Sequence, residues 1–410
     1  MARYDVIIVG AGLAGLSAAS TLARESDATV GIVEKTDVGN NNPSPMIFAD
    51  VVEQFHLEDC VQGQYRRFTF HSPLGNKSSH SYETVPLVTL DYKEACRQLL
   101  RRSTHVGNVN LIRDEVAKVQ RSTDGRWEVS VIDGLPLVSP LLIDASGRSL
   151  LVTRLLDLPA PRMYSHCFGQ VFVGASVPEP DEIVFLAPSD RFGDGGGWWY
   201  PLSDGRISFG YATLSDTRTY PGQRVKERYR LALREFSPYA DWLAEAQPDH
   251  VEMGTIPICP PRRFVYDGLM LVGDAAGQAT IWSCMGTEPA LISGQLAGRA
   301  AVKAHRRGDY SRAVLGDYQA RWDQMYRRMY RQGALLAPVT WRQGEVSWNQ
   351  QIPRVQELTP EQMLARLRVN WPQLPWWKIM FIRAYDWLGR IRRSIMGFLK
   401  MTLRQKEVRS

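Results

Sequence analysis

The sequence is poor in the residues that build covalent or metal-bound frameworks. It has only 5 cysteines in 410 residues, an odd number, and no two of them form a CxxC pair. Disulfide frameworks and zinc sites both need closely spaced or paired cysteines, so neither is expected. The 7 histidines are dispersed as well. We therefore expect no metal site and a reducing compartment.

Long hydrophobic runs, a secretory signal and internal repeats are also lacking. No apolar run approaches the ~20 residues that a membrane-spanning helix needs. The first strand pattern begins at Tyr4, which leaves no room for a signal peptide. With 44% hydrophobic and 22% charged residues, the composition is typical of a globular protein. These features predict a cytoplasmic protein. Because 410 residues exceed the usual size of a single hydrophobic core, two closely associated lobes are expected.

The net positive charge of the chain is concentrated at its end. Residues 361–410 contain 11 Lys or Arg and 3 Asp or Glu, whereas the whole chain has a formal net charge of +6. A nucleic-acid binder would more often carry a basic face on the body of the fold. We therefore expect no nucleic-acid partner.

The residues after Pro372 have the pattern of a basic amphipathic helix. At 100° per residue, tryptophans and aliphatic residues fall on one face, and Lys and Arg fall on the other. This pattern favours peripheral contact with the inner face of a membrane through residues 371–405. The alternative is that the apolar face packs on the protein itself.

A glycine motif follows the first apolar run. Residues 4–9 have the pattern of a strand, and Gly10, Gly12 and Gly15 have GxGxxG spacing where a helical pattern begins. The first glycine permits a tight turn, the second lets the backbone approach a pyrophosphate, and the third allows close helix packing. The helix N-terminus, with Ala14 in its first turn, offers free amides to phosphate oxygens. The motif therefore predicts a dinucleotide site.

An acidic residue ends the second strand pattern. Residues 29–33 are β-rich and lead into Glu34, which can accept hydrogen bonds from both hydroxyls of an adenosine ribose. The strand, helix, second strand and terminal acid together form a βαβ unit. This unit alone does not separate FAD from NAD.

A second glycine and acid step lies more than 200 residues later. The apolar run 269–272 ends in Gly273 and Asp274. Gly273 allows a close backbone approach, and Asp274 can bond a ribitol hydroxyl. Amides at Gly286 and Thr287, where the next helix begins, are suited to stabilise negative charge on a reduced flavin. Alternatively, Asp274 is only the N-cap residue of a helix. Taken together with the N-terminal glycine motif, however, the Gly273-Asp274 pair favours FAD as the cofactor.

The expected fold class is α/β, with a Rossmann-like FAD-binding domain, an inserted β-rich substrate domain and a C-terminal helical tail. The segments between Tyr164 and Ile256 are β-rich, with one helix from about Val225 to Glu245. Residues 36–87 have irregular signals and include a loop of Asn and Pro that is long for a compact domain. The expected boundaries are 1–163 and 257–306 for the FAD-binding domain, 164–256 with parts of 36–90 for the substrate domain, and 307–410 for the helical region.

With these motifs the sequence resembles the p-hydroxybenzoate hydroxylase-like flavoproteins, and among them the geranylgeranyl reductase, lycopene cyclase and flavin-dependent halogenase branches. The resemblance covers residues 1 to about 305. Besides the two glycine motifs, it is carried by the Asp144-Ala-Ser-Gly147 turn and by the aromatic strand that ends in Pro201. It implies that Asp144 and Gly147 contact the cofactor.

The sequence also departs from these branches. Geranylgeranyl reductases open the flavin helix with Gly-Glu-Gly, whereas this chain has Met285, Gly286, Thr287 and Glu288. The WxWxIP signature of the halogenases is not matched, and no counterpart of their catalytic lysine is found. Halogenation is therefore disfavoured.

The resemblance implies a substrate side lined by an aromatic strand. Trp198, Trp199 and Tyr200 belong to this strand, and Cys284 precedes the flavin helix. Large aromatics also commonly pack a sheet against helices, and an unassigned cysteine is often a small packing residue. No Ser-His-Asp triad is visible, and no catalytic residue or proton donor is assigned.

The function implied by the resemblance is that of an FAD-dependent oxidoreductase which reduces carbon–carbon double bonds of a lipophilic, isoprenoid substrate. The alternatives are a flavin-dependent monooxygenase, acting as a hydroxylase or, less favoured, a halogenase, and a non-redox lycopene cyclase-like enzyme that uses reduced FAD. A flavin-binding module without turnover is a further alternative. No second nucleotide fingerprint appears, and we expect NAD(P)H or ferredoxin as the electron donor.

Overall fold

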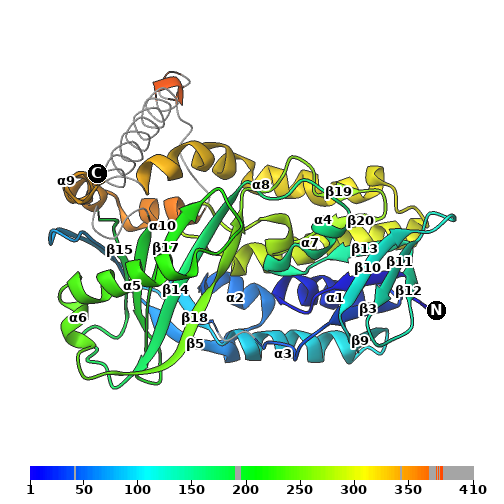
Figure 1. Ribbon diagram of the computed structural model, residues 1–410, viewed down its shortest axis with the longest axis horizontal. Helices are drawn as coiled ribbons and strands as arrows, with labels where there is room; N and C mark the ends of the chain where they lie inside the picture. Colours follow the sequence, from blue (N-terminus) through cyan, green and yellow to red (C-terminus); the bar gives the residue numbers. More distant parts are fainter. Residues whose placement is uncertain are drawn as a thin grey trace, which may run out of the picture.

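A parallel sheet carries both glycine motifs in the computed structural model (Figure 1). The structure describes residues 1–40, 43–189, 195–341, 344–368, 375, 377 and 379–381. Five strands of this sheet run parallel, and β19 pairs with its edge in the antiparallel direction. The order is β19 (Val265–Tyr266), β20 (Leu269–Leu271), β13 (Leu141–Asp144), β2 (Val6–Val9), β3 (Val30–Glu34) and β9 (Val109–Arg113). The central strands are runs of buried aliphatic residues, as expected where both faces are covered.

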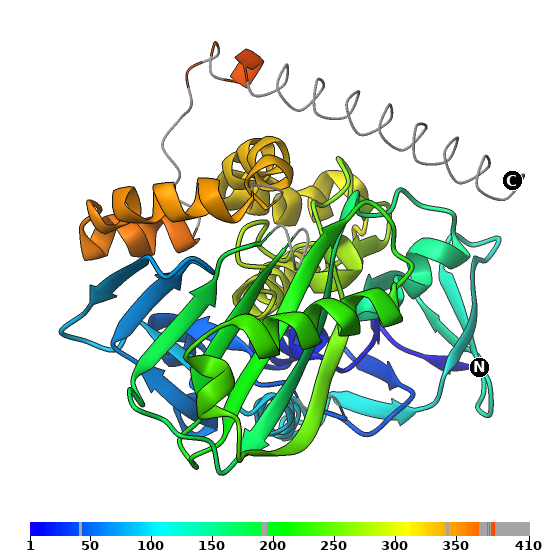
Figure 2. The same ribbon diagram turned by 60° about the vertical axis from the view of Figure 1, so that its left-hand side comes forward.

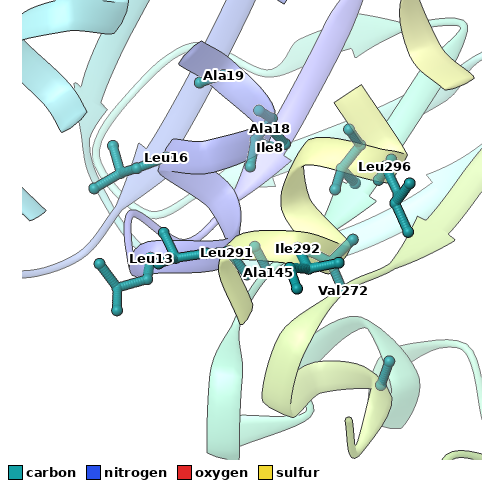
Figure 3. Close-up of a cluster of buried hydrophobic side chains, with 14 of the residues drawn as sticks. Ile8, Leu13, Leu16, Ala18, Ala19, Ala145, Val272, Leu291, Ile292 and Leu296 are labelled. Atoms are coloured by element: carbon teal, nitrogen blue, oxygen red, sulfur yellow. The ribbon is translucent and has the colours of Figure 1, made fainter. Parts of the chain in front are cut away.

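Two helices pack directly on one another beside this sheet (Figure 3). They are α1 (Leu13–Glu25), which follows the first glycine motif, and α7 (Thr287–Arg307), which follows the second. The backbones approach so closely that a Cβ added at Gly294 would lie 2.2 Å from the carbonyl oxygen of Ala14. The Ser17 hydroxyl donates a hydrogen bond of 2.7 Å to the carbonyl oxygen of Leu291. This contact brings together segments that lie far apart in the sequence.

A second, seven-stranded sheet forms the other half of the molecule (Figure 1). Neighbouring strands are antiparallel, except that β15 and β6 are parallel. The order is β18 (Gln247–Ile258), β14 (Met163–Val173), β17 (Ile207–Ser215), β16 (Gly196–Pro201), β15 (Glu182–Leu186), β6 (Arg67–His71) and β7 (Lys77–Ser81). This arrangement confirms the predicted fold class of a nucleotide-binding sheet with a separate β-rich region.

The stretch 36–87 is more regular than its sequence suggests. It contributes β6 and β7 to the large sheet, and β4 and β5 to a three-stranded sheet. That small sheet has the order β4 (Met46–Phe48), β8 (Leu87–Leu90) and β5 (Val61–Tyr65). Its strands are only three to five residues long, and α2 (Ala49–Phe55) interrupts them. Short strands give little periodic signal, which explains why they were not predicted.

Further elements flank the nucleotide-binding sheet. A four-stranded sheet has the order β1 (Ala2–Arg3), β12 (Leu137–Ser139), β11 (Trp127–Val131) and β10 (Val116–Arg121). The helix α3 (Tyr92–Thr104) and the short helix α4 (Leu151–Leu155) are part of the same region, and the side chain of Asp91 caps α3. Short 3-10 turns lie at Glu58–Cys60, Gly147–Ser149 and Gly273–Ala276.

Helices cover the outer face of the large sheet (Figure 2). The single helix expected from about Val225 to Glu245 is instead two helices, α5 (Gly222–Glu235) and α6 (Tyr239–Trp242). Pro238 lies between them, and proline cannot donate the backbone hydrogen bond that continues a helix. Trp199 packs against α6, with ring centroids 5.2 Å from Tyr239 and 5.5 Å from Trp242.

The last described helices lie along one side of both sheets (Figures 1 and 2). They are α8 (Arg312–Thr340), α9 (Glu345–Gln356) and α10 (Pro360–Arg368). On α8, the Tyr318 hydroxyl donates to the carbonyl oxygen of Leu271 at 2.8 Å and accepts from the Gln278 amide at 2.8 Å. The Tyr330 hydroxyl donates to the carbonyl oxygen of Gln278. The helix α8 therefore supports the turn that follows β20.

The predicted amphipathic tail lies largely outside the described residues. Of the stretch 371–405, the structure describes Pro375, Trp377 and residues 379–381. In the part of the chain that is described, no helix has both the length and the apolar character needed to cross a bilayer.

Candidate cofactor and substrate site

One large cavity lies between the nucleotide-binding sheet and the large sheet. Its volume is about 680 Å³, which is within the range of small-molecule sites. One part of its lining comes from the turns that follow the two glycine motifs, and another comes from β15, β16, β17 and β18. The cavity is therefore bounded by two regions that fold as separate sheets.

Two helix N-termini open onto this cavity without side-chain caps. Gly12 is the N-cap residue of α1 and Gly286 is the N-cap residue of α7, and neither helix has a side-chain hydrogen bond at its cap. The first turn of α1 has no acidic residue, whereas that of α7 has Glu288. Gly12 and Gly286 both line the cavity. Because uncapped helix N-termini present free amides and a partial positive charge, this end of the cavity is suited to anionic groups.

The first glycine motif is held by close backbone contacts. Gly10 has a φ of +105°, and a Cβ there would lie 2.3 Å from the carbonyl oxygen of Ala145. A Cβ at Gly15 would lie 2.2 Å from the carbonyl oxygen of Gly10. The Ala11 amide donates to Oε2 of Glu34 at 2.9 Å, so the acid at the end of β3 lies beside the glycine turn. Gly10, Gly15 and Glu34 support the turn rather than forming the cavity wall.

The second motif places a carboxyl group in the cavity. Asp274 lines the cavity, and a Cβ added at Gly286 would lie 3.4 Å from its Oδ1. Burial raises the pKa of Asp274 to about 6, and the positive charge of Arg148 opposes this shift. Gly273 lies behind the wall, where a Cβ would approach that of Ala14 at 2.9 Å. The carboxyl group of Asp274 therefore lies beside the N-terminus of α7.

The raised pKa of Asp274 predicts a pH-dependent stability of the cofactor-free protein. The folded state binds this proton more tightly than the unfolded state, whose pKa is near the ordinary 3.8. The contribution of Asp274 to the free energy of unfolding should therefore be fully present below about pH 4 and be lost, by at most ~3 kcal/mol, as the pH rises through about 6. Denaturant unfolding of wild-type and Asp274→Asn apoprotein across this range measures the effect. Parallel stability curves for the two proteins would contradict it.

The turn after β13 contributes one of its two predicted residues to the cavity. Gly147 lines the cavity, together with Arg148, which had not been predicted. Asp144 instead lies in the interior with no exposed surface, and its Oδ1 accepts a hydrogen bond of 3.0 Å from the Ser146 amide. Burial raises the pKa of Asp144. The structure therefore places Asp144 behind the wall, as a support for the turn, and corrects the expectation of a cofactor contact.

The aromatic strand presents its residues to opposite sides of the sheet. Trp198 and Tyr200 line the cavity. Trp199 lies on the opposite face and packs under α5 and α6, because successive residues of a strand alternate in direction. The expectation that Trp199 lines the substrate side is therefore wrong. The Trp198 ring lies across two neighbouring strands, where Cβ atoms at Gly169 and Gly210 would be 2.8 and 2.1 Å away.

A hydrogen-bonded chain fixes Trp198 and connects the large sheet to the loop before β4. The Trp198 indole donates to the Ser208 hydroxyl at 3.0 Å, and that hydroxyl donates to Oε2 of Glu252 at 2.8 Å. Oε1 of Glu252 accepts from the Ser44 amide at 2.6 Å. The Tyr200 hydroxyl donates to the carbonyl oxygen of Ser44 at 2.8 Å. The aromatic wall therefore has a fixed position relative to this loop.

Cys284 lines the cavity in an unusual backbone conformation. Its φ is +54°, a region that non-glycine residues rarely adopt. Burial raises the pKa of its thiol to about 11, so the thiol stays protonated at neutral pH. Cys167, on β14, lines the same cavity, and burial raises its pKa to about 12. No group of three or more potential metal ligands occurs among the described residues.

The structure brings most of the predicted site residues to this one cavity. Those that line it are Gly12, Ala14, Gly147, Trp198, Tyr200, Asp274, Cys284, Gly286 and Thr287. Other residues that line the cavity were not predicted from the sequence. Two of them follow local signals: Arg148 comes directly after the predicted turn, and Tyr92 comes directly after the helix N-cap Asp91. No local signal marks the others, which are Glu252, Trp282 and Trp341.

The residues present fit FAD. Two uncapped helix N-termini, one buried carboxyl group and one apolar wall share a single cavity. Gly12 lines the cavity without a Cβ atom that would obstruct the approach to α1, and a Cβ there would lie 3.1 Å from the Tyr92 hydroxyl. A phosphate-bearing cofactor with a flat apolar end matches this distribution of groups.

Comparison with known proteins identifies the family. The family described as lycopene cyclase protein matches residues 5–281. Digeranylgeranylglycerophospholipid reductase 2 of Methanopyrus kandleri is 28% identical over 345 residues, which cover 80% of this chain and 84% of the relative. Digeranylgeranylglycerophospholipid reductase 1 of Methanosphaera stadtmanae is 24% identical, with 79% of this chain and 81% of the relative covered.

Solved structures share the fold. A geranylgeranyl bacteriochlorophyll reductase-like protein from Thermoplasma acidophilum superposes with a TM-score of 0.79 at 16% identity, covering 94% of this chain and 96% of that chain. A flavin-dependent brominase superposes with a TM-score of 0.71 at 16% identity, covering 96% of this chain and 100% of that chain. The recognition of a flavoprotein fold of the geranylgeranyl reductase and lycopene cyclase kind is thereby confirmed.

Proposed function

The chain belongs to the lycopene cyclase protein family, and on this premise we propose that it is an FAD-dependent oxidoreductase that reduces carbon–carbon double bonds of a lipophilic isoprenoid. The observation that carries the proposal is one cavity that joins two free helix N-termini and Asp274 to an apolar aromatic wall. The names of the relatives, which are reductases of a geranylgeranyl lipid, support the same substrate class.

The residues at the polar end would hold the cofactor. The N-terminus of α1 at Gly12 would bind the pyrophosphate, and Glu34, which lies beside the glycine turn and outside the cavity lining, would bind the adenosine ribose there. Asp274 would bind the ribitol, and the amides of Gly286 and Thr287 would stabilise negative charge on the flavin ring. The chemistry that FAD supplies when bound is hydride transfer to a double bond.

The residues at the apolar end would bind the hydrocarbon and exclude water. Ile183, Phe185 and Trp198 line this part of the cavity. Burial holds the pKa of Tyr200 well above its ordinary value and raises that of Cys284 to about 11. Both groups therefore remain neutral at physiological pH, so they add no charge that would repel an alkene.

We propose that electrons come from an external donor, NAD(P)H or ferredoxin. A lipid substrate also makes contact with a membrane useful, and peripheral attachment through residues 371–405 on the cytoplasmic side remains part of the proposal. Of the described residues in that stretch, Trp377, Met380 and Phe381 have exposed fractions of 55, 57 and 72%. Aromatic and apolar side chains at such exposure are suited to the lipid interface.

The test is direct. Protein purified with detergent should be yellow and should contain FAD that dithionite reduces under anaerobic conditions. Supplied with a geranylgeranyl lipid, the reduced protein should return a product heavier by two hydrogen atoms for each double bond reduced. Oxygen consumption with insertion of an oxygen atom would instead identify a monooxygenase. A protein that takes up no flavin would refute the proposal entirely.

The family described as lycopene cyclase protein favours one alternative, a cyclase that needs reduced FAD without net electron transfer. Product mass separates the two activities because cyclisation leaves the mass of the substrate unchanged. The same incubation, analysed by mass spectrometry and chromatography, therefore decides between them.

A further inference from the structure

Two neighbouring tryptophans belong to the lining of the cavity. Trp282 precedes α7 and Trp341 directly follows α8, and both side chains line the cavity. Their ring centroids are 6.5 Å apart, and the rings are tilted by 45°. The polar half, at Gly12 and Asp274, belongs to different elements. The two indoles are therefore suited to limit the hydrocarbon space without touching the groups that would hold the phosphates.

Trp341 is held firmly against the large sheet. Its carbonyl oxygen accepts a hydrogen bond of 3.1 Å from the Gly195 amide. Its ring lies directly on β16, because a Cβ at Gly196 would be 2.5 Å from a ring carbon. On another side, the ring centroid of Trp348 is 6.3 Å away. A side chain with only two rotatable bonds, packed in this way, has a fixed position in the cavity.

The sequence around β16 is complementary to this indole. Any side chain at Gly196 would collide with Trp341, so the glycine provides the space in which the ring lies. Gly197 is similarly close to Leu186, whose Cδ1 would be 3.1 Å from an added Cβ. The bare strand surface and the tryptophan together form one continuous apolar wall.

From this geometry we infer that Trp341, with Trp282, sets the length of the isoprenoid chain that the cavity admits. The inference rests on the proposed function and specifies its substrate. Because the Trp341 ring lies in a fixed position against β16, a hydrocarbon chain that extends from the flavin position toward it would meet the two indoles, and the chain length accommodated would depend on their size. Trp341 is a specificity-determining residue in this proposal and takes no part in the chemistry.

The test measures binding as well as turnover. FAD-loaded wild-type protein and the variants Trp341→Phe and Trp341→Ala are titrated with prenyl alcohols of increasing length, from geraniol upward, and quenching of flavin fluorescence reports binding. The wild type should gain affinity with each added unit until a limiting length. Trp341→Ala should move that limit up by at least one isoprene unit, with a gain of about tenfold for the first alcohol beyond it. Trp341→Phe should give a smaller gain.

A control variant separates this effect from general destabilisation. Trp242→Ala also removes an indole, but Trp242 lies on α6 at the outer face of the large sheet and does not line the cavity. Its limiting length should equal that of the wild type. If both Trp341 variants retain flavin and keep the wild-type limit, the inference is wrong although the proposed function stands. If no prenyl alcohol binds to any of the proteins, the proposed function fails and the inference fails with it.

Discussion

Gly294→Ala should separate α1 from α7 and deprive the protein of its flavin. The added Cβ would lie 2.2 Å from the carbonyl oxygen of Ala14 and 2.8 Å from Cβ of Ser17. Because a backbone atom is involved, no side-chain rotation relieves the collision, and one helix must shift. Overpacking of this kind costs about 3 kcal/mol of unfolding free energy. The shift would also move the first turn of α1, where the pyrophosphate is expected to bind.

A matched glycine on another helix provides the control. Gly316 lies within α8, and a Cβ there would have no neighbour within 4 Å. Gly316→Ala should therefore raise the free energy of unfolding by about 0.5–1 kcal/mol, since alanine favours a helix over glycine. Denaturant unfolding and the flavin content of the two purified variants measure the contrast. Equal behaviour of the two variants would show that the contact between α1 and α7 is not critical.

Gly286→Val should abolish FAD binding while leaving the fold intact. A Cβ at this position would lie 3.4 Å from Oδ1 of Asp274 and 3.8 Å from Cβ of Ala279, and both are ordinary contacts. The remaining space belongs to the cavity, where the branched side chain would lie between the N-terminus of α7 and the flavin. We expect the dissociation constant for FAD to rise by at least about 100-fold, because the lost contacts are charge-assisted.

Two measurements test this prediction together. Fluorescence titration of apoprotein with FAD gives the affinity, and denaturant unfolding of the apoprotein should differ from the wild type by only about 1 kcal/mol. Gly286→Ala, with a smaller side chain, should weaken binding less than Gly286→Val. Copurification of Gly286→Val with a full complement of FAD would place the cofactor elsewhere in the protein.

The parts of the fold that were predicted have strong local signals. The helix after the first motif and the helix that begins at Thr287 were both identified, because glycine steps and apolar periodicity mark their starts. The strand β18 was not identified as a separate element, since it includes Pro248, Asp249 and several partly exposed residues. Its pairing with β14 along eleven positions compensates for the weak intrinsic preference, and such tertiary contacts leave no local pattern in the sequence.

The candidate site divides in the same way. Asp274 and Gly12 follow strands, where a known backbone geometry makes a residue's role predictable. Glu252 and Trp341 are different, because each reaches the cavity only through the packing of distant elements. Trp199 shows the limit of reasoning from a motif: the residue lies in the predicted strand, but its direction depends on the pleat. Neighbouring residues of a strand face opposite sides of the sheet, so one position along β16 decides whether an indole faces the cavity or the helix α6.

The long helix α8 has a consequence for redesign of the protein. Tyr318 and Tyr330 on this helix hydrogen-bond to the segment around Asp274, and Trp341, which directly follows the helix, lines the same cavity. Substitutions in the buried middle of α8 would move both Asp274, which is proposed to bind the cofactor, and Trp341, which is proposed to limit the hydrocarbon chain. Cofactor affinity and substrate range would therefore change together. Substitutions intended to change the substrate range alone should therefore be made at Trp341, while Tyr318 and Tyr330 are left unchanged.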